Sequence, residues 1–339
     1  MKLPSADFYP GSFALVMATG IISTAAFLLS FLVLARILLF ANILFYAALW
    51  LMTLRRLIVS FPRLRADLRG HATGAGFFTT VAGTCVLGTQ IALVTGDYAV
   101  AMVLWILGLF LWLLLTYAFL GAVITSRTKP DFGAAINGGW LVAVVATQSI
   151  SVLATVLSPG YPASSEALLF LSLCFCLAGG MLYIIIMTLL FYRLVFFALA
   201  PGDLSPLSWV SMGAAAITTL SGARLVLSAG EWSFLAGLGS FLTGFTILFW
   251  SVATWWIPLL VVLGVWRHLV RGIPFRYQPH YWGMVFPLGM YTACTFVTSR
   301  ATGLSFLTVI PGVFLWIALA AWLAVFAGML GEIGRKRTT

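Results

Sequence analysis

The sequence has few charged residues. Lysine, arginine, aspartate and glutamate together make up 8% of its 339 residues, whereas hydrophobic residues make up 62%. A water-soluble globular domain carries about a quarter charged residues, so this composition excludes a soluble protein. The apolar runs are continuous and about 20 residues or longer, which predicts membrane-spanning helices, because a transmembrane β-barrel would show short alternating segments instead.

Ionisable residues that could perform chemistry inside a membrane are nearly absent. The eight acids lie at or near the ends of apolar runs, and the three histidines lie between the runs. The sequence contains neither paired carboxylates nor an HExxH, Walker or Rossmann pattern. The four cysteines lie inside apolar runs, without the spacing of a metal site or a disulfide framework. We therefore expect no enzyme, no metal and no cofactor.

Charges, glycines and prolines divide the chain into ten predicted membrane spans. Several spans exceed the roughly 20 residues that a bilayer requires, so we expect tilt or extension past the membrane. The prediction is an all-α integral membrane protein with a single transmembrane domain over residues 1–339. Its spans are residues 10–32, 35–58, 73–96, 98–126, 136–158, 165–199, 205–229, 233–266, 280–300 and 304–331.

The basic residues predict the orientation of the chain. With ten spans, 15 of the 18 basic residues fall on one side, which the positive-inside rule assigns to the cytoplasm together with both termini. Topology thus accounts for the net charge of +10, and we expect a lipid bilayer but no nucleic acid as partner. We expect a multi-pass protein of the cell (inner) membrane. The 15 residues are Lys2, Arg55, Arg56, Arg63, Arg65, Arg69, Arg127, Lys129, Arg193, Arg267, Arg271, Arg276, Arg335, Lys336 and Arg337.

Each odd-numbered span opens with an aromatic residue that is followed by small residues. These aromatics recur at spacings of 65, 62, 69 and 73 residues, which favours five successive helical hairpins of the same orientation. An aromatic belt at the cytoplasmic interface is the alternative account. The aromatics are Phe13, Phe78, Trp140, Trp209 and Trp282.

Odd and even spans differ in composition. Odd spans are rich in Gly, Ala, Ser and Thr, whereas even spans are rich in large apolar residues. Small residues permit close helix contact or leave room for a lumen. The pattern predicts five odd helices around a pore, surrounded by five even helices. Hydrogen bonding between helices is the alternative role for the polar residues. The predicted pore-lining residues are Thr19, Gly20, Gly83, Thr84, Thr147, Gln148, Ala214, Thr218, Gly289 and Met290.

Such a neutral pore would favour anions for two reasons. The odd helices begin on the cytoplasmic side, so the positive ends of their dipoles face the cytosol. The basic loops also raise the local concentration of anions. On the far side, Arg224 and Arg300 end spans 7 and 9 and are candidate basic residues of the outer mouth. Alternatively, each arginine complements a helix C-terminus or pairs with Glu231.

The most distinctive motif lies in span 9, which reads HYWGMVFPLGMYTACTF. Pro287 removes a backbone donor and favours a kink in the helix. Phe286 directly precedes it, and a bulky ring beside a kink could close a narrow neutral pore by dewetting. Packing of Phe286 in an ordinary core is the alternative.

Several motifs together resemble the tellurite-resistance/dicarboxylate transporter family, which includes the plant slow anion channels. They are FALVMATGIIS in span 1, Gly83-Thr84 and Gly88-Thr89-Gln90 in span 3, VATQSIS in span 5 and WGMVFPLGMY in span 9. The resemblance extends over all ten spans. It implies five hairpins with quasi-fivefold symmetry around a pore, a homotrimer with one pore per subunit, and occlusion of the pore by Phe286.

Members of that family move malate-like dicarboxylates, sulfite, nitrate or chloride, or confer tellurite resistance, and the resemblance does not choose among these anions. The sequence departs from relatives whose odd spans carry several prolines, because Pro287 is the only proline in the middle of an odd span here. We expect a channel for small anions gated by Phe286. A secondary carrier for a C4-dicarboxylate, sulfite or tellurite, coupled or not to protons, is the alternative, and a membrane enzyme or structural subunit is the third hypothesis.

Overall fold

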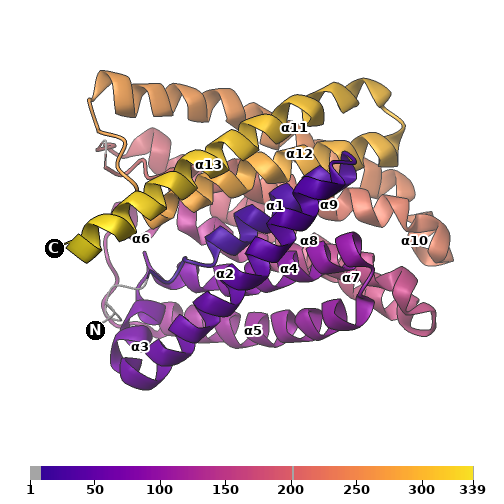
Figure 1. Ribbon diagram of the computed structural model, residues 1–339, viewed down its shortest axis with the longest axis horizontal. Helices are drawn as coiled ribbons and strands as arrows, with labels where there is room; N and C mark the ends of the chain where they lie inside the picture. Colours follow the sequence, from indigo (N-terminus) through magenta and orange to yellow (C-terminus); the bar gives the residue numbers. More distant parts are fainter. Residues whose placement is uncertain (1–8, 201, 339) are drawn as a thin grey trace.

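The chain forms helices joined by short loops, as the computed structural model shows for residues 9–200 and 202–338 (Figure 1). No strand occurs within these ranges. Three short helices, α3 (Phe61–Arg69), α6 (Phe132–Ala135) and α10 (Ser233–Gly237), lie between longer ones. The longer helices are α1 (Ala14–Leu28), α2 (Leu32–Val59), α4 (Phe78–Thr95), α5 (Tyr98–Thr125), α7 (Val142–Leu157), α8 (Ser165–Phe196), α9 (Val210–Leu227), α11 (Gly239–Val265), α12 (Trp282–Thr302) and α13 (Val309–Thr338).

Eight helical segments of the described chain are long and apolar enough to cross a membrane. They contain α2, α4, α5, α7, α8, α9, α11 and α13. Helix α1 is apolar but has only 15 residues, and α12 is not among the eight. The predicted all-helical membrane protein is therefore confirmed, whereas the count of ten spans stays a prediction.

Five helices, which we call the inner helices, contact one another in a closed cycle. Helix α1 packs against α4, α4 against α7, α7 against α9, α9 against α12, and α12 against α1. Small residues allow this close approach. A Cβ atom added at Gly76, just before α4, would lie 3.1 Å from the backbone nitrogen of Gly11, just before α1. The inner helices therefore enclose a common axis.

The outer helices α2, α5, α8, α11 and α13 cover this cycle. Each packs against the inner helix that precedes it in the sequence and against the next inner helix in the cycle. Their apolar residues are mostly exposed on the outside of the molecule, for example Phe40, Phe110 and Leu248, whereas α4, α7 and α9 are mostly buried. Large apolar side chains exposed over long helices indicate contact with lipid rather than with water.

A short turn precedes each inner helix. Four of these turns are 3₁₀ helices, at Gly74–Phe77, Gly138–Leu141, Pro206–Trp209 and Pro279–Tyr281. The turn before α1 has the same type of bond, since the backbone amide of Ala14 donates to the carbonyl oxygen of Gly11 at 3.1 Å. The recurring aromatics of the sequence lie at or beside these turns, so the repeat has a structural counterpart at the start of each inner helix.

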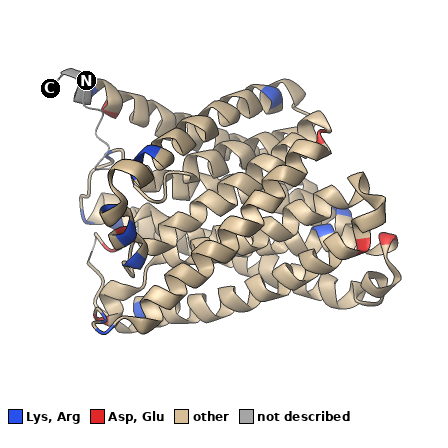
Figure 2. Ribbon diagram, turned by 90° about the horizontal axis from the view of Figure 1, so that it is seen from below, with Lys and Arg blue, Asp and Glu red and all other residues tan. Residues whose placement is uncertain are grey.

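The charged residues are unevenly distributed along the bundle. Lys and Arg gather at the end where both chain termini lie, and a smaller mixed group lies at the opposite end (Figure 2). This distribution agrees with the predicted positive side. Lys2 lies outside the described residues, as do the side chains of Lys336 and Arg337.

Three features differ from the predicted spans. The segment 233–266 is not continuous, because α10 ends at Gly237 and α11 begins at Gly239. Glycine at both positions weakens helical continuity there. The basic segment after span 2, predicted as a connection between spans, forms α3. Span 1 is shorter than predicted, since α1 ends at Leu28 and Ser30 adopts a left-handed φ of 67°.

Candidate functional site

An inner cavity lies where the inner helices begin. Its lining comes only from the five inner helices and the segments that precede them. The space available to the centre of a water molecule is about 20 Å³, enough for about one water. The lining residues are Tyr9, Gly11, Ala14, Met17, Ala72, Gly76, Thr79, Gly139, Val142, Leu207, Val210, Pro279, His280, Gly283 and Phe286.

An outer cavity of similar size lies further along the same five helices. It too has about 20 Å³ for the centre of a water molecule, and no outer helix contributes to it. Its lining residues are Ile21, Thr24, Leu28, Val86, Thr89, Ser149, Val152, Ile217, Leu220, Arg224, Met290 and Ala293.

The two cavities lie along the same helix faces. On α12, lining positions 283 and 286 belong to the inner cavity, and positions 290 and 293 belong to the outer cavity. On α1, positions 14 and 17 continue to 21, 24 and 28 in the same way. Residues spaced three and four apart share one face of an α-helix, so the cavities follow each other along the common axis.

Phe286 is the last α12 residue of the inner cavity, one helical turn before Met290 in the outer cavity. Its side chain is 1% exposed. Four residues of helix advance about 6 Å, so the ring lies at the boundary between the two small cavities. The axis is therefore closed near Phe286, with room for about one water on either side.

Close contacts fix the backbone around Phe286. A Cβ atom added at Gly213 on α9 would lie 2.7 Å from Cγ of Pro287, and one added at Gly289 would lie 2.8 Å from Cγ2 of Ile21. Glycine at these two positions lets α12 approach both α9 and α1. Helix α12 continues through Pro287, whose missing amide leaves one carbonyl of the preceding turn without its usual donor.

A wide vestibule opens onto the inner cavity at the end that carries the termini. It has about 710 Å³ of space for water and shares four lining residues with the inner cavity, namely Tyr9, Ala72, Leu207 and His280. Arg193 and Asp203 also line the vestibule and form an ion pair at 3.6 Å. The ion pair is partly exposed, so solvent screens its charges.

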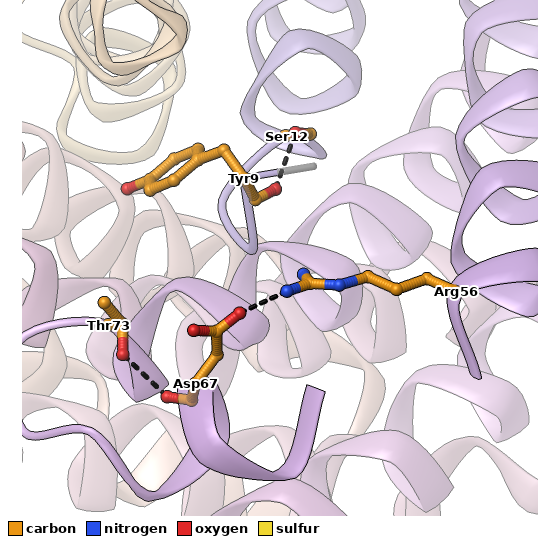
Figure 3. A network of polar contacts seen from close by, with 5 residues as sticks. All are labelled: Tyr9, Ser12, Arg56, Asp67 and Thr73. Atoms are coloured by element: carbon orange, nitrogen blue, oxygen red, sulfur yellow. Dashed lines mark hydrogen bonds and ion pairs between the residues drawn. The ribbon is translucent and has the colours of Figure 1, made fainter. Parts of the chain in front are cut away.

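Polar contacts hold the segments around the vestibule. Arg56 near the end of α2 forms an ion pair with Asp67 of α3, and the hydroxyl of Thr73 donates to the carbonyl oxygen of Asp67 at 2.7 Å (Figure 3). In the same region the hydroxyl of Ser12 donates to the carbonyl oxygen of Tyr9 at 2.6 Å (Figure 3). These bonds anchor α3 and the turn before α1 beside the entrance to the axis.

Several predicted pore-lining residues form hydrogen bonds to outer helices. The hydroxyl of Thr19 accepts from the indole of Trp322 at 2.9 Å, and that of Thr147 accepts from Trp112 at 2.8 Å. Thr84 and the hydroxyl of Tyr46 are 3.0 Å apart. These bonds provide the interhelical role that the sequence left open as an alternative, and a role of these three threonines in lining a pore stays a prediction.

The same pattern of bonding recurs around the cycle. The indole of Trp250 on α11 donates to the hydroxyl of Thr295 on α12 at 3.0 Å, and the hydroxyl of Tyr183 on α8 donates to the carbonyl oxygen of Ser211 on α9 at 3.1 Å. Each outer helix thus uses an aromatic donor group to contact the inner helix that follows it. Gln148 contacts an outer helix too, because its amide donates to the carbonyl oxygen of Cys176 at 2.9 Å.

The remaining predicted residues lie in different surroundings. An added Cβ at Gly20 would meet Val86 and the amide of Asn42, and one at Gly83 would meet Phe13. Met290 lines the outer cavity. Ala214 and Thr218 are fully buried on α9, where the Thr218 hydroxyl donates to the carbonyl oxygen of Ala214 at 2.8 Å.

The two arginines predicted at the outer mouth differ in position. Arg224 lines the outer cavity, and its Nε is buried without a hydrogen-bond partner. Arg300 is exposed and lies over the ring of Phe296, with its guanidinium carbon 5.4 Å from the ring centre. Neither pairs with Glu231, whose carboxylate accepts hydrogen bonds from the hydroxyls of Ser158 and Ser165.

Sequence reasoning missed most residues that line the cavities. Met17, Thr24, Val86 and Leu220 are examples, and most of the others are also apolar. The available signal was a stripe of residues three and four apart on each odd span, but a helix face in an ordinary core has the same pattern. Among the described residues no group of His, Cys, Asp and Glu is arranged to hold a metal ion.

Comparison with known proteins gives concordant results. A family model described as SLAC1, voltage-dependent anion channel, matches residues 7–330. An uncharacterized membrane protein of Mycobacterium tuberculosis is 38% identical over 152 residues, which are 45% of this chain and 77% of that protein. An uncharacterized transporter of Methanocaldococcus jannaschii is 24% identical over 339 residues, covering 96% of this chain and 95% of that protein. These descriptions name a channel, a transporter and a membrane protein, and none names an enzyme.

Proposed function

Since the chain belongs to the SLAC1 family of voltage-dependent anion channels, we propose that it conducts small anions along the axis of its inner helices, with Phe286 as the gate. The family resemblance drawn from the span motifs is confirmed, and anion transport in general follows from the family. The proposal adds a route, a gate and a channel mechanism.

One observation carries the proposal. Two cavities lined by all five inner helices follow each other along one axis, and the ring of Phe286 lies at their boundary. Ordinary core packing does not explain why both cavities lie on the same helix faces. An apolar constriction that holds about one water on each side favours closure by dewetting. Rotation of the Phe286 side chain away from the axis would join the cavities.

The charges along the axis favour anions. The inner cavity is lined by no Asp, Glu, Lys or Arg, and the outer cavity has Arg224 as its one charged residue. All five inner helices begin at the inner cavity, so their positive dipole ends face the vestibule. A cation entering from the vestibule would meet these dipole ends and, further on, the charge of Arg224, with no carboxylate to stabilise it.

The architecture proposed with this function has ten spans as five hairpins, quasi-fivefold around the pore. The closed cycle of inner helices, the turn before each of them and the repeated bonds from outer helices support it. We place both termini in the cytoplasm and the protein in the cell (inner) membrane, because basic residues gather at the end that carries the termini (Figure 2). The proposed homotrimer with one pore per subunit is based on the family resemblance.

A secondary carrier is the alternative mechanism. The relatives from Methanocaldococcus jannaschii are named as transporters. A closed axis is also compatible with a carrier that transports a C4-dicarboxylate, sulfite or tellurite. A proton-coupled carrier uses ionisable groups inside the membrane, and neither cavity is lined by an acid.

Measurement of reversal potentials in planar bilayers tests the proposal. The purified protein is reconstituted and exposed to gradients of chloride, nitrate, sulfite and malate, with the cation unchanged. A channel gives currents that reverse near the equilibrium potential of a permeant anion and do not depend on a pH gradient. Currents that follow the cation gradient, or flux that occurs only with a pH gradient, would refute the channel for anions.

A further inference from the structure

An apolar groove, separate from the axis, lies beside the end of α11. Its volume is about 340 Å³, and pockets that bind small ligands measure roughly 300–1,000 Å³. The last turns of α11 form one wall, and the turns that precede α9 and α12 form the other. The groove therefore lies at the end of the bundle where the inner helices begin. It shares no lining residue with the inner or the outer cavity.

The groove opens toward the outer surface of the bundle. Val261, Val265 and Leu269 line it, and all three side chains are exposed. Gly264 also lines it, and a Cβ atom added there would meet no atom within 4 Å. The glycine thus leaves a gap on an outer helix that is otherwise covered by large apolar side chains. An exposed apolar surface of this kind on a membrane-spanning helix is in contact with acyl chains.

Two basic residues also line the groove, and no acid does. Arg267 and His268 belong to a π-helical turn, Trp266–Val270, that directly follows α11. Turns of this type occur frequently at functional sites. The ring of His268 stacks on that of Phe275, with ring centres 3.8 Å apart, and Phe275 lines the groove as well. The groove therefore combines an apolar wall with a positive charge.

The guanidinium of Arg267 is held at the groove but has no acidic partner. One of its terminal nitrogens donates to the carbonyl oxygen of Leu204 on the opposite wall. A guanidinium has five N–H donors, so others remain for a ligand. Asp203, which precedes Leu204, pairs with Arg193 instead, and among the described residues no acid pairs with Arg267. The positive charge is thus available to a ligand in the groove.

We propose that this groove binds one anionic phospholipid, with an acyl chain over Gly264 and the phosphate at Arg267. A phospholipid carries an apolar chain and a negative head group in one molecule, so it matches both parts of the groove. A guanidinium binds a phosphate through two parallel hydrogen bonds. Basic pockets between helices on the cytoplasmic side bind anionic head groups in the same way. Since the groove is separate from the axis, binding does not rest on the proposed function.

Thermal unfolding of the purified, detergent-solubilised chain tests the site. Phosphatidylglycerol is titrated in mixed micelles and compared with phosphatidylcholine of the same acyl chains, which has no net charge. We expect saturable stabilisation by phosphatidylglycerol and a weaker effect of phosphatidylcholine, because a ligand that binds the folded state stabilises it. Native mass spectrometry of the same samples should show one tightly retained phosphatidylglycerol per chain.

One variant fills the groove without changing its charge. Gly264→Phe places a ring in the open space and should raise the apparent Kd for phosphatidylglycerol about tenfold or more. Gly244→Phe is the matched control, because Gly244 lies in open space on the same helix but outside the groove. It should bind like the wild type. If Gly264→Phe does not fold, Gly264→Leu replaces it as a smaller filling.

A second variant changes the charge without filling the groove. Arg267→Gln should reduce the preference for phosphatidylglycerol over phosphatidylcholine about tenfold, whereas Arg267→Lys should retain part of it. Arg127→Gln is the control, because Arg127 is exposed, belongs to the basic residues of the same side and does not line the groove. It should leave the preference unchanged.

Four results would overturn the proposal. The first is equal phosphatidylglycerol binding by the wild type and Gly264→Phe. The second is equal binding of the two lipids by the wild type. The third is stabilisation by glycerol 3-phosphate that matches that by phosphatidylglycerol, because it would assign Arg267 to a free phosphate. The fourth is a smaller oligomer in Gly264→Phe with unchanged lipid binding, because it would assign the groove to a contact between copies of the chain.

Discussion

The gate predicts a specific effect of shortening the side chain of residue 286. Replacing Phe286 by Ala removes the ring at the boundary between the inner and outer cavities, so the axis can fill with water without any side-chain movement. In the wild type, opening exposes a buried ring to a wet axis, which costs about 1.5–3 kcal/mol. Since about 1.4 kcal/mol corresponds to a factor of ten, the variant should raise anion flux roughly 10- to 150-fold.

The assay is efflux of chloride from liposomes in the absence of a proton gradient. Phe249→Ala is the matched control, because Phe249 is 2% exposed but lies on α11, where its ring is 5.5 Å from that of Tyr183 and away from both cavities. It should lose stability without a gain in flux. Phe286→Leu should give an intermediate flux, and it retains more packing if the alanine variant unfolds.

A folded Phe286→Ala protein with wild-type flux would refute the reasoning. So would an equal gain in Phe249→Ala, because it would show that any loosening of the bundle leads to leakage.

Two further predictions concern the packing that positions the axis. Trp322→Phe removes the hydrogen bond from α13 to α1 and should lower the free energy of unfolding by about 0.6–1.7 kcal/mol. Trp316→Phe, at a residue on the same helix that is 52% exposed, should be near neutral. Equal thermal shifts in the two variants would contradict this account. Gly213→Ala places a methyl group 2.7 Å from the ring of Pro287, which cannot move freely, so overpacking should lower the free energy of unfolding by about 1–3 kcal/mol. Gly244→Ala, in open space on α11, should have no such cost. Tolerance of both changes would refute the close packing of α9 on α12.

The sequence was sufficient to predict the helices because their cause is local. Long apolar runs must satisfy their backbone groups internally, and the ends of most predicted spans lie within a few residues of the helix ends. Helix α3 was missed because its sequence, FPRLRADLR, has the charge expected of a connecting segment. Helix α3 packs against α2 and α5, and the sequence does not display these contacts.

The site was harder to predict because a polar side chain on an inner helix can point either to the axis or to an outer helix. Thr147 was predicted to line the pore because the odd spans are rich in small and polar residues, yet its hydroxyl bonds to Trp112 on an outer helix. Thr24, which lines the outer cavity, was not singled out. The composition of a span does not reveal which of its faces points to the axis. Phe286 was singled out because its motif contains a proline, a feature that stands out within an apolar helix, and its role as a gate stays a prediction.

Accessibility of single cysteines tests most directly that one axis passes Phe286. In a background with Cys174, the exposed cysteine, replaced by serine, Met17→Cys reports on the inner cavity and Met290→Cys on the outer cavity. A small charged thiol reagent added to the vestibule side should modify residue 17 but not residue 290 while Phe286 is present. In Phe286→Ala it should modify both. Modification of residue 290 from that side in both backgrounds, or in neither, would contradict a path along the inner helices that Phe286 closes.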